Sequence, residues 1–365
     1  MTAGSWVPGP TVVRVPATSA NLGPGFDAFG LALALHDLVE ARVTGDGLAV
    51  DVRGEGEQTA AAGERHLVVA AMRAAFAAMG GQPPGLALRC VNAIPHGRGL
   101  GSSAAAVVSG ILAARALVAG GADRLPDAEV LRLAVDLEGH PDNVAACLAG
   151  GLTVAWRPGA DSPVGLLRLD VLGGLTTVAC LAPTAMATHE ARRALPEFVP
   201  HADAAANAAR SALLLAALTR DPAVLFDATE DFLHQRYRAA AQPATADLLG
   251  RLRTAGVAAV VSGAGPSILA LGLPGLRPGL EVVDSIARET GIAWLVTPLK
   301  VDRKGATVLP REQGVPPPDT ARQGQSRSPA PGPGMRPAGG STQGRAASPA
   351  THGPQPRECR GLLWC

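Results

Sequence analysis

The stretch PHGRGLGSSAA at residues 95–105 has a glycine at every second position from 97 to 101, then two serines and a long apolar run. The glycines allow the backbone to turn tightly and to approach a ligand without a Cβ clash. Ser102 and Ser103 stand where we predict a helix to begin, and the unpaired N–H groups of a helix N-terminus attract an anion. The stretch therefore predicts a phosphate-binding loop between a strand and a helix. The alternative is an ordinary glycine-rich turn with a serine cap.

Two common nucleotide motifs do not fit this stretch. A Walker loop would end in Gly-Lys followed by Ser or Thr, and a dinucleotide fingerprint would read GxGxxG, whereas residues 97–102 read GRGLGS. Two other glycine segments, PATSANLGPGFDAFGLAL at 16–33 and VVSGAGPSILAL at 260–271, lie next to predicted strands. EGHPDN at 138–143 breaks one predicted helix and begins another, so its side chains either point into a cleft or simply cap the helix.

The charge distribution argues against nucleic-acid binding. The 365 residues carry a formal charge of +1, and 47% of them are hydrophobic and 17% charged. Residues 304–365 hold eight of the 32 Lys and Arg but only three of the 31 Asp and Glu, which leaves 24 basic and 28 acidic groups in residues 1–303. A mildly acidic body lacks the basic face that nucleic acid requires. We therefore predict no nucleic-acid partner.

The sequence also argues against export and against a membrane span. The five cysteines form no CxxC pair and no short Cys/His spacing typical of zinc sites. The first residues, MTAGSWVPGP, lack the basic and apolar regions of a secretory signal. Residues 104–122 approach the length of a membrane span, but they are richer in alanine than in leucine and contain three glycines, so we predict a buried helix. We expect a cytoplasmic protein with no membrane partner.

Apolar patterns predict interleaved strands and helices, so the fold class is α/β or α+β. Short alternating or β-branched runs predict strands at 11–15, 48–52, 86–91, 152–156, 175–181, 257–261 and 268–271. Longer periodic runs predict helices at 64–79, 102–119, 127–138, 142–149, 203–219, 222–238, 244–254 and 281–290. Three aspartates are placed as N-caps of these helices, namely Asp127, Asp142 and Asp221.

A polar stretch with Pro and Gly at 157–163 is the best place to divide the chain. We predict an N-terminal domain at residues 1–160 and a second domain at 161–303. From residue 310 onward, eleven of the 31 prolines fall among Gly, Ser, Gln and Arg, and no apolar period persists. We therefore predict a disordered Pro/Gly/Arg-rich tail at 304–365, whose role the sequence does not indicate.

Taken together, the three glycine segments resemble, in the same order, the motifs of the GHMP family of small-molecule kinases. Residues 95–105 are similar to the family's phosphate loop, PATSANLGPGFDAFG to its N-terminal motif and VSGAGPSILAL to its C-terminal glycine motif. Within the family, SANLGPGFD, EGHPDN, ARRALP at 191–196 and HQRYR at 234–238 resemble the homoserine kinases. The Gly-Glu-His signature of galactokinases is missing, and mevalonate kinases would have Asp where this chain has Asn143.

The resemblance implies an α+β fold of two domains: an N-terminal ATP-binding domain like domain 2 of ribosomal protein S5, and a ferredoxin-like C-terminal domain. It also implies ATP-dependent phosphorylation of the side-chain hydroxyl of L-homoserine to O-phospho-L-homoserine, for threonine biosynthesis. ATP and Mg²⁺ would be the cofactors, and a homodimer the expected assembly.

The resemblance further implies which residues hold ATP and the metal. The ATP phosphates would lie on Pro95, His96, Gly97, Arg98, Gly99, Leu100, Gly101, Ser102, Ser103, Ala104 and Ala105. Backbone N–H groups of this loop would neutralise the phosphates, and a serine and a carboxylate would hold Mg²⁺. Ser103 and Glu138 are the expected metal ligands, while Ser102 and Glu129 are alternatives that the folded positions decide.

Homoserine is a zwitterion with a hydroxyl tail, so its site needs a carboxylate clamp, an ammonium acceptor and a group that aims the hydroxyl. The resemblance places Arg192 and Arg238 on the carboxylate, where a guanidinium fork fits well. It places Asp27 on the ammonium. The other expected substrate residues, at the hydroxyl end or next to it, are Asn21, His140, Asn143 and Thr188.

Asn143, His140 and Arg192 are the expected catalytic residues. An amide cannot take a proton as an Asp does, so we predict catalysis by positioning, without a dedicated base. His140 has an alternative role as a neutral structural residue at the helix break. Two other functions stay open: a GHMP kinase for another small alcohol such as mevalonate, and a non-catalytic module that binds nucleotide or an amino acid. The presence of Glu138, both serines and the loop glycines argues against the second.

Overall fold

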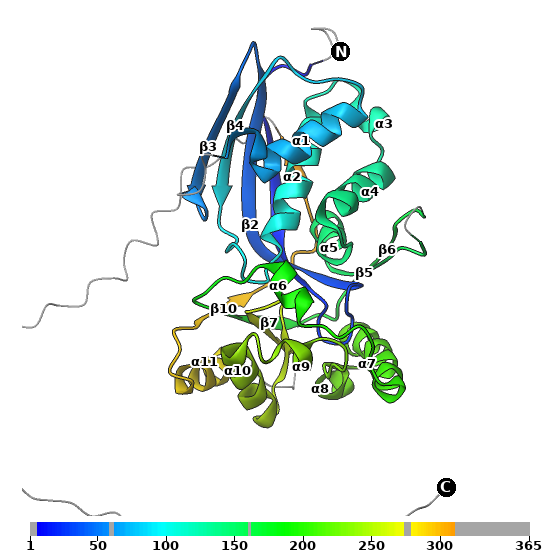
Figure 1. The fold of residues 1–365 in the computed structure, drawn as a ribbon, viewed down its shortest axis with the longest axis vertical. Coiled ribbons are helices and arrows are strands. Elements are labelled where there is room, and N and C mark those ends of the chain that lie inside the picture. The colour runs from blue at the N-terminus through cyan, green and yellow to red at the C-terminus, as the bar shows by residue number, and fades with distance from the viewer. Residues whose placement is uncertain (1–5, 58–61, 160–161, 274–278, 311–365) are drawn as a thin grey trace, which may run out of the picture. The chain divides into compact units, whose positions relative to one another are not determined.

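The computed structural model describes residues 6–57, 62–159, 162–273 and 279–310, which all belong to one compact unit, Met1–Pro316. Within this unit, two β-sheets each carry packed helices (Figure 1). The predicted α+β class is confirmed. One continuous cluster of buried apolar side chains includes residues of both sheets and of the helices on them, so the two sheets share a core. From the smaller sheet and its helices, the cluster includes Leu181, Leu214 and Leu269.

The larger sheet has seven strands. Its main path is β11-β1-β2-β4-β3, with β5 beside β2 and β6 beside β5. Among the described strands of this sheet, β3 and β4 are the one parallel pair, because a helix connects them as a crossover. The strands are β1 (Thr11–Ala20), β2 (Phe29–Thr44), β3 (Leu48–Gly54), β4 (Gly85–Asn92), β5 (Leu152–Trp156), β6 (Gly165–Leu169) and β11 (Thr307–Leu309).

Helices cover one face of this sheet (Figure 1). They are α1 (Leu67–Ala78), α2 (Ser102–Ala116), α3 (Gly121–Arg124), α4 (Asp127–Glu138) and α5 (Asp142–Ala149), and a 3-10 turn, η3 (Gly63–Arg65), precedes them. The small side chains of α2 let it lie close against β1 and β2, and most of its residues are buried. The predicted buried helix is therefore confirmed. No helix in the described part of the chain is long and apolar enough to cross a membrane.

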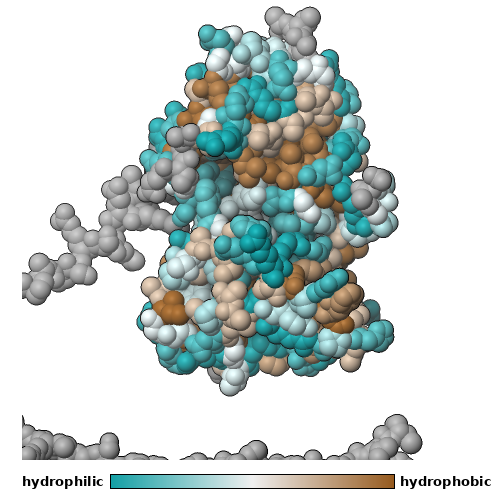
Figure 2. Space-filling view, in the orientation of Figure 1, coloured by the Kyte–Doolittle hydropathy of each residue, from teal (hydrophilic) through white to brown (hydrophobic). Residues whose placement is uncertain are grey.

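The smaller sheet has four antiparallel strands in the order β10-β7-β9-β8. The strands are β7 (Thr176–Leu181), β8 (Ala258–Val261), β9 (Ile268–Gly272) and β10 (Leu295–Leu299). The helices of this part are α6 (Thr188–Arg193), α7 (His201–Thr219), η4 (Pro222–Val224), α8 (Leu225–Ala228), α9 (Gln235–Arg238), α10 (Pro243–Thr254) and α11 (Leu280–Glu289). Figure 1 shows α6 where the two sheets meet. In Figure 2, the surface over this polar helix is hydrophilic. The surface above it, over α1, α2 and α4, is hydrophobic.

All seven predicted strands are present, but the sequence patterns missed β2, β6, β10 and β11. β2 is the most consequential omission, because it pairs with β1, β4 and β5. Its first five residues are all buried, and a regular alternation of buried and less buried residues begins only in its second half. The continuous apolar start therefore concealed the period of two that marks a strand.

The prediction of a single helix at 222–238 is wrong. Pro222 begins the 3-10 turn η4, and α8 and α9 are separate short helices. The break lies at Asp231, whose carboxylate accepts hydrogen bonds from the backbone N–H groups of residues 233, 234 and 235. A side chain that competes for backbone donors in this way ends a helix. The sequence patterns also missed the short helices α3 and α6.

One of the three predicted N-caps is confirmed. Asp221 caps η4 and accepts a hydrogen bond from the backbone N–H of Ala223 at 3.2 Å. Asp127 and Asp142 are not N-caps, because a proline occupies that position before α4 and α5 and each Asp is the first helical residue. Asp127 instead forms an ion pair with Arg115 at 2.6 Å.

The larger sheet extends past both predicted boundaries. β6 pairs with β5, and β11 pairs with β1, although both strands lie outside the predicted N-terminal domain at 1–160. The prediction of disorder is wrong for residues 304–310, since this segment contains β11 and two backbone N–H groups that donate to Asp302. The rest of the predicted tail, 311–365, lies outside the described residues. The division into domains near residue 160 stays a prediction.

Candidate active site

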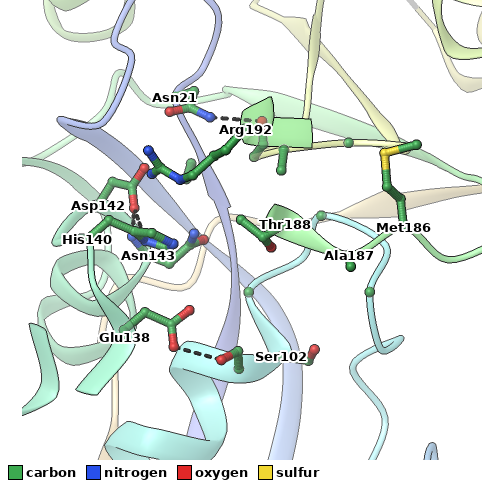
Figure 3. A pocket seen from close by; sticks show the side chains of 18 of the residues that line it. Asn21, Ser102, Glu138, His140, Asp142, Asn143, Met186, Ala187, Thr188 and Arg192 are labelled. Carbon is green, nitrogen blue, oxygen red and sulfur yellow. Dashed lines mark hydrogen bonds and ion pairs between the residues drawn. The ribbon is translucent and has the colours of Figure 1, made fainter. Parts of the chain in front are cut away.

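A cavity of about 150 Å³ lies where the two sheets meet (Figure 3). It is lined by the turn after β1, the loop before α2, the junction of α4 and α5, the connection from β7 into α6, and the loop between β8 and β9. Arg238 at the end of α9 completes the lining. The motifs at 16–33, 95–105, 138–143 and 260–271, which are far apart in the chain, thus meet at one place.

The backbone of the phosphate loop requires its glycines. The three φ angles are positive, at +64° for Gly97, +73° for Gly99 and +69° for Gly101. A Cβ on Gly99 would meet the backbone of Ser262, and one on Gly101 would meet the side chains of Thr18 and Asn143. Gly101 is also the N-cap of α2, so the loop leads directly into unpaired helix N–H groups. A backbone cradle without room for side chains, at a helix N-terminus, fits a phosphate.

The expected metal ligands lie side by side at the edge of this cradle. Ser103 Oγ donates a hydrogen bond to Glu138 Oε2 at 2.7 Å. Burial raises the pKa of the Glu138 carboxyl, and the hydrogen bond from Ser103 opposes this shift. Glu129 does not line the cavity and instead forms an ion pair with Arg132 at 2.8 Å, whereas Ser102 lines it as Ser103 does.

These side chains fit Mg²⁺ held mainly by nucleotide phosphates and water. Among the described residues, no group of three or more His, Cys, Asp or Glu side chains is placed to hold a metal ion. Mg²⁺ bound together with a nucleotide needs only one or two carboxylates or hydroxyls from the protein, because the phosphates and waters supply its other ligands.

The junction of α4 and α5 holds His140 and Asn143 in fixed orientations. Asp142 Oδ1 lies 3.1 Å from His140 Nδ1 and accepts a hydrogen bond from the Asn143 backbone N–H at 2.7 Å. Burial alone would lower the pKa of His140, but the hydrogen bond and charge of Asp142 outweigh it and raise the pKa. Thr18 Oγ1 donates to Asn143 Oδ1 at 2.8 Å. Two buried neighbours, Asp142 and Thr18, therefore hold the side chains of His140 and Asn143 in place at the wall of the cavity.

Asp27 and Arg192, expected to bind opposite ends of one substrate, bind each other here. Arg192 Nη1 and Nη2 donate to the two Asp27 carboxylate oxygens at 3.0 and 2.7 Å. The side chains are 36% and 37% exposed, so the pair is open to solvent and to the cavity. In Figure 3, Arg192 extends from α6 across the site toward Asp142 and His140.

Arg238 is held more tightly than Arg192. It is 3% exposed, and its Nη1 donates to His234 Nδ1 at 3.0 Å. Burial lowers the pKa of His234, so its neutral ring accepts at Nδ1 and donates from Nε2 to the Gly23 carbonyl at 2.8 Å. Burial and the charge of Arg192 lower the pKa of Arg238 to about 10, which still leaves it protonated at neutral pH. The Phe26 ring lies 5.9 and 5.7 Å from the two guanidinium carbons and stabilises both charges.

The remaining predicted residues divide between lining and support. Thr188 begins α6 and lines the cavity. Asn21 also lines it, but Asn21 Nδ2 donates to the Gly263 carbonyl at 2.8 Å and Asn21 Oδ1 accepts from the Asp27 N–H at 2.9 Å, so its amide ties two motifs together. Of residues 95–105, those that do not line this cavity are Pro95, His96, Arg98, Leu100, Ala104 and Ala105.

A second cavity of about 370 Å³ shares Ser102 and Ser103 with the first. Its lining includes His66, His96 and Asp37, and the Asp37 Oδ1 accepts two backbone N–H groups after β4 at 2.7 and 2.9 Å. Burial raises the pKa of Asp37 to about 6. Of the residues that line this cavity, the sequence predicted only His96, Ser102 and Ser103 as site residues. The rest were missed because the cavity forms between β2, β4, α1 and α2 and has no contiguous motif of its own.

Sequence reasoning also missed Thr18, Asp142 and His234 as supports of the first cavity. Each lies inside a quoted segment: Thr18 in 16–33, Asp142 in 138–143 and His234 in 234–238. The motifs thus marked the right segments, but only the folded contacts separate residues that face the cavity from those that hold them in place.

Comparisons with known proteins agree with this geometry. Residues 66–151 match the family model described as the GHMP kinases N terminal domain. The homoserine kinase of Streptomyces avermitilis is 51% identical over 298 residues, which cover 82% of this chain and 95% of that protein. The homoserine kinase of Clavibacter michiganensis is also 51% identical, covering 83% of this chain and 95% of that one.

Solved structures show the same fold. The crystal structure of homoserine kinase from Cytophaga hutchinsonii matches with a TM-score of 0.69 at 25% identity, covering 82% of this chain and 97% of that one. Mevalonate kinase of L. major matches with a TM-score of 0.58 at 16% identity, covering 82% and 98% of the two chains, which shows likeness of fold alone. From its identity to curated relatives across nearly their whole length, we conclude that this chain belongs to the homoserine kinase family, within the GHMP kinases.

Proposed function

We propose that this chain transfers the γ-phosphoryl group of ATP to the side-chain hydroxyl of L-homoserine, giving O-phospho-L-homoserine and ADP, in threonine biosynthesis (EC 2.7.1.39). The observation that carries the proposal is one cavity that joins a glycine cradle for phosphate to an exposed Asp27–Arg192 ion pair. A phosphate donor and a zwitterionic acceptor would then meet in a space where reacting groups are held close.

The Asp27–Arg192 pair matches a zwitterion because each partner can exchange the other for a substrate charge. The homoserine carboxylate would replace Asp27 on Arg192, and the ammonium would replace Arg192 on Asp27. Arg238 adds a second, buried cation beside Phe26 for the carboxylate. Thr188 and Asn21 line the same space. An alcohol that carries only one of the two charges would replace one partner of the ion pair and leave the other partner unpaired.

The two adjoining cavities suggest where ATP, the phosphate donor, would bind. The loop at 97–103 would hold the ATP phosphates, and the second cavity, which begins at Ser102 and Ser103, would take the ribose and base. Ser103 and Glu138 would hold Mg²⁺, which supplies positive charge to the transferring phosphoryl group when bound. Arg192 would add further positive charge at the acceptor side.

We propose catalysis by positioning, without a protein base. Asn143 would contact the acceptor hydroxyl, and its amide has no site that takes up a proton at neutral pH. His140, oriented by Asp142, would line the same end and fix the approach of the hydroxyl. Because phosphoryl transfer passes through a loose transition state, orientation and charge neutralisation supply most of the rate.

A coupled ADP-release assay tests the proposal. The full chain with MgATP is compared with L-homoserine, mevalonate, galactose and no acceptor, and the product is identified by mass. We expect turnover with L-homoserine alone. Turnover with another alcohol would retain a kinase but reject the acceptor site. A folded protein with no turnover on any acceptor would favour the non-catalytic binding module.

Three further proposals come from the sequence. The family resemblance implies a homodimer, and the cysteine pattern favours a cytoplasmic location. The resemblance and the polar stretch at 157–163 together favour a division into an N-terminal ATP-binding domain and a C-terminal domain. Sedimentation velocity on the full chain tests the first of them, since a monomer at micromolar concentration would contradict it.

A further inference from the structure

Thr18 connects the two halves of the site. It lies on β1 and is fully buried, at 0% exposure. Its backbone N–H donates to the carbonyl of Leu100, in the middle of the phosphate loop, at 3.0 Å. Its hydroxyl donates to Asn143 Oδ1, on the acceptor side, at 2.8 Å. One residue thus contacts the backbone that would carry the donor and the amide that would meet the acceptor.

The packing at Gly101 leaves this arrangement little freedom. A Cβ on Gly101 would meet both Thr18 Oγ1 and Asn143 Oδ1, so the loop backbone, the threonine hydroxyl and the amide are in mutual contact. In a close-packed interior of this kind, a shift of one group displaces the others. The position of the loop relative to Asn143 is therefore set through Thr18.

The hydrogen bond also sets which end of the Asn143 amide is free. Oδ1 is occupied by the Thr18 hydroxyl, which leaves Nδ2 to donate a hydrogen bond. An amide without this partner can rotate about its terminal torsion, because that torsion has broad energy minima. Loss of the Thr18 hydroxyl would therefore leave the Asn143 side chain in place but without a fixed orientation of its amide group.

We propose that Thr18 is a positioning residue for phosphoryl transfer: it holds the phosphate loop and the Asn143 amide at a fixed separation and keeps Asn143 Nδ2 directed at the acceptor oxygen. The inference rests on the proposed function and adds a residue that acts through Asn143 without contacting either substrate. Because no base contributes to the rate, small errors in position have large consequences.

Thr18→Val tests the proposal, since it keeps the shape of the side chain and removes the hydroxyl. We expect kcat for L-homoserine to fall about 10- to 100-fold, with KM for both substrates changed by less than about threefold. Thr18→Ser restores the hydroxyl and should recover most of kcat. Thr18→Val combined with Asn143→Ala should be no slower than Asn143→Ala alone, because both changes remove the same interaction.

Thr153→Val is the matched control. Thr153 is also fully buried in the larger sheet, and its hydroxyl donates to the Gly30 carbonyl at 3.3 Å, but it does not line either cavity. This variant should keep wild-type kcat. A Thr18→Val enzyme as active as Thr153→Val, or a double variant whose loss equals the product of the two single losses, would overturn the positioning role.

A measurement without turnover separates this inference from the proposed function. In protein labelled with ¹⁵N at asparagine, the side-chain amide signals of Asn143 are assigned by their loss in Asn143→Ala. We expect these signals to shift in Thr18→Val and to stay in place in Thr18→Ser and Thr153→Val. Unchanged Asn143 signals in Thr18→Val would overturn the inference, even in a chain whose wild type fails to phosphorylate homoserine.

Discussion

At the scale of single residues, the proposed function assigns the ammonium group of the substrate to Asp27, which lines the cavity and pairs with Arg192. We predict that Asp27→Asn raises KM for L-homoserine about 10- to 100-fold, because a neutral amide cannot replace a charge-assisted hydrogen bond. Asn tolerates the positive φ of +56° at this position, so the turn should keep its shape. The measurement is steady-state kinetics with L-homoserine and with 4-hydroxybutyrate, which lacks the ammonium group.

The ratio of kcat/KM for L-homoserine to kcat/KM for 4-hydroxybutyrate makes this prediction specific. In the wild type, 4-hydroxybutyrate should be a poor acceptor because it leaves Asp27 unpaired. Asp27→Asn should bring the kcat/KM values of the two acceptors closer together. Arg193→Ala is the control, since Arg193 neighbours Arg192 on α6 but is exposed and does not line the cavity. An unchanged ratio in Asp27→Asn would show that another group binds the ammonium.

At the scale of elements, the phosphate loop depends on what its glycines touch as well as on their φ angles. Gly101 and Gly120 are both N-caps, with φ of +69° and +67°. A Cβ on Gly101 would meet Thr18 and Asn143, whereas one on Gly120 has its nearest neighbour at 3.9 Å. We predict that Gly101→Ala lowers kcat/KM about 100-fold or more, because the loop must move away from the acceptor side.

Gly120→Ala isolates the cost of backbone strain. It should lower the free energy of unfolding by about 1–2 kcal/mol through the left-handed conformation and leave kcat/KM unchanged. Thermal unfolding and kinetics of both variants make the comparison. Equal activity of the two variants would mean that the contacts at Gly101 do not matter for the site.

At the scale of the whole molecule, β11 is the last strand in the described part of the chain. We predict that a chain ending at residue 316 keeps the activity and melting temperature of the full chain, because residues 6–310 already contain both sheets and both cavities. A chain ending at residue 303 loses the pairing of β11 with β1 and two hydrogen bonds to Asp302. Its melting temperature should fall by about 2–8 °C.

The comparison of the two truncations is the test, measured by circular dichroism and the ADP-release assay. A large loss of activity or melting temperature on ending the chain at residue 316 would show that the segment beyond it supports the body. Equal melting temperatures for the two shortened chains would show that β11 adds nothing to stability.

The site could be predicted from the sequence as far as its parts are contiguous. Gly97, Gly99 and Gly101 predict a backbone cradle, because glycine allows the positive φ angles and the close backbone contacts found there. Arg192 and Asp27 were assigned opposite substrate charges, and the fold brings them together. The direct contact between these two side chains could not be predicted, because no pattern along the chain encodes the distance between residues 165 positions apart.

Local sequence determined what depends on neighbours along the chain: seven strands, the buried alanine helix α2, the cap at Asp221 and the glycine turns. Tertiary structure decided what depends on contacts between distant segments. It placed β2, β6 and β11 in the larger sheet, put Glu138 and not Glu129 in the lining of the cavity, and brought Thr18 into contact with Asn143. The physical reason is that turns and periods are local energetic preferences, whereas a site is a set of distances fixed only when separate elements pack on one core.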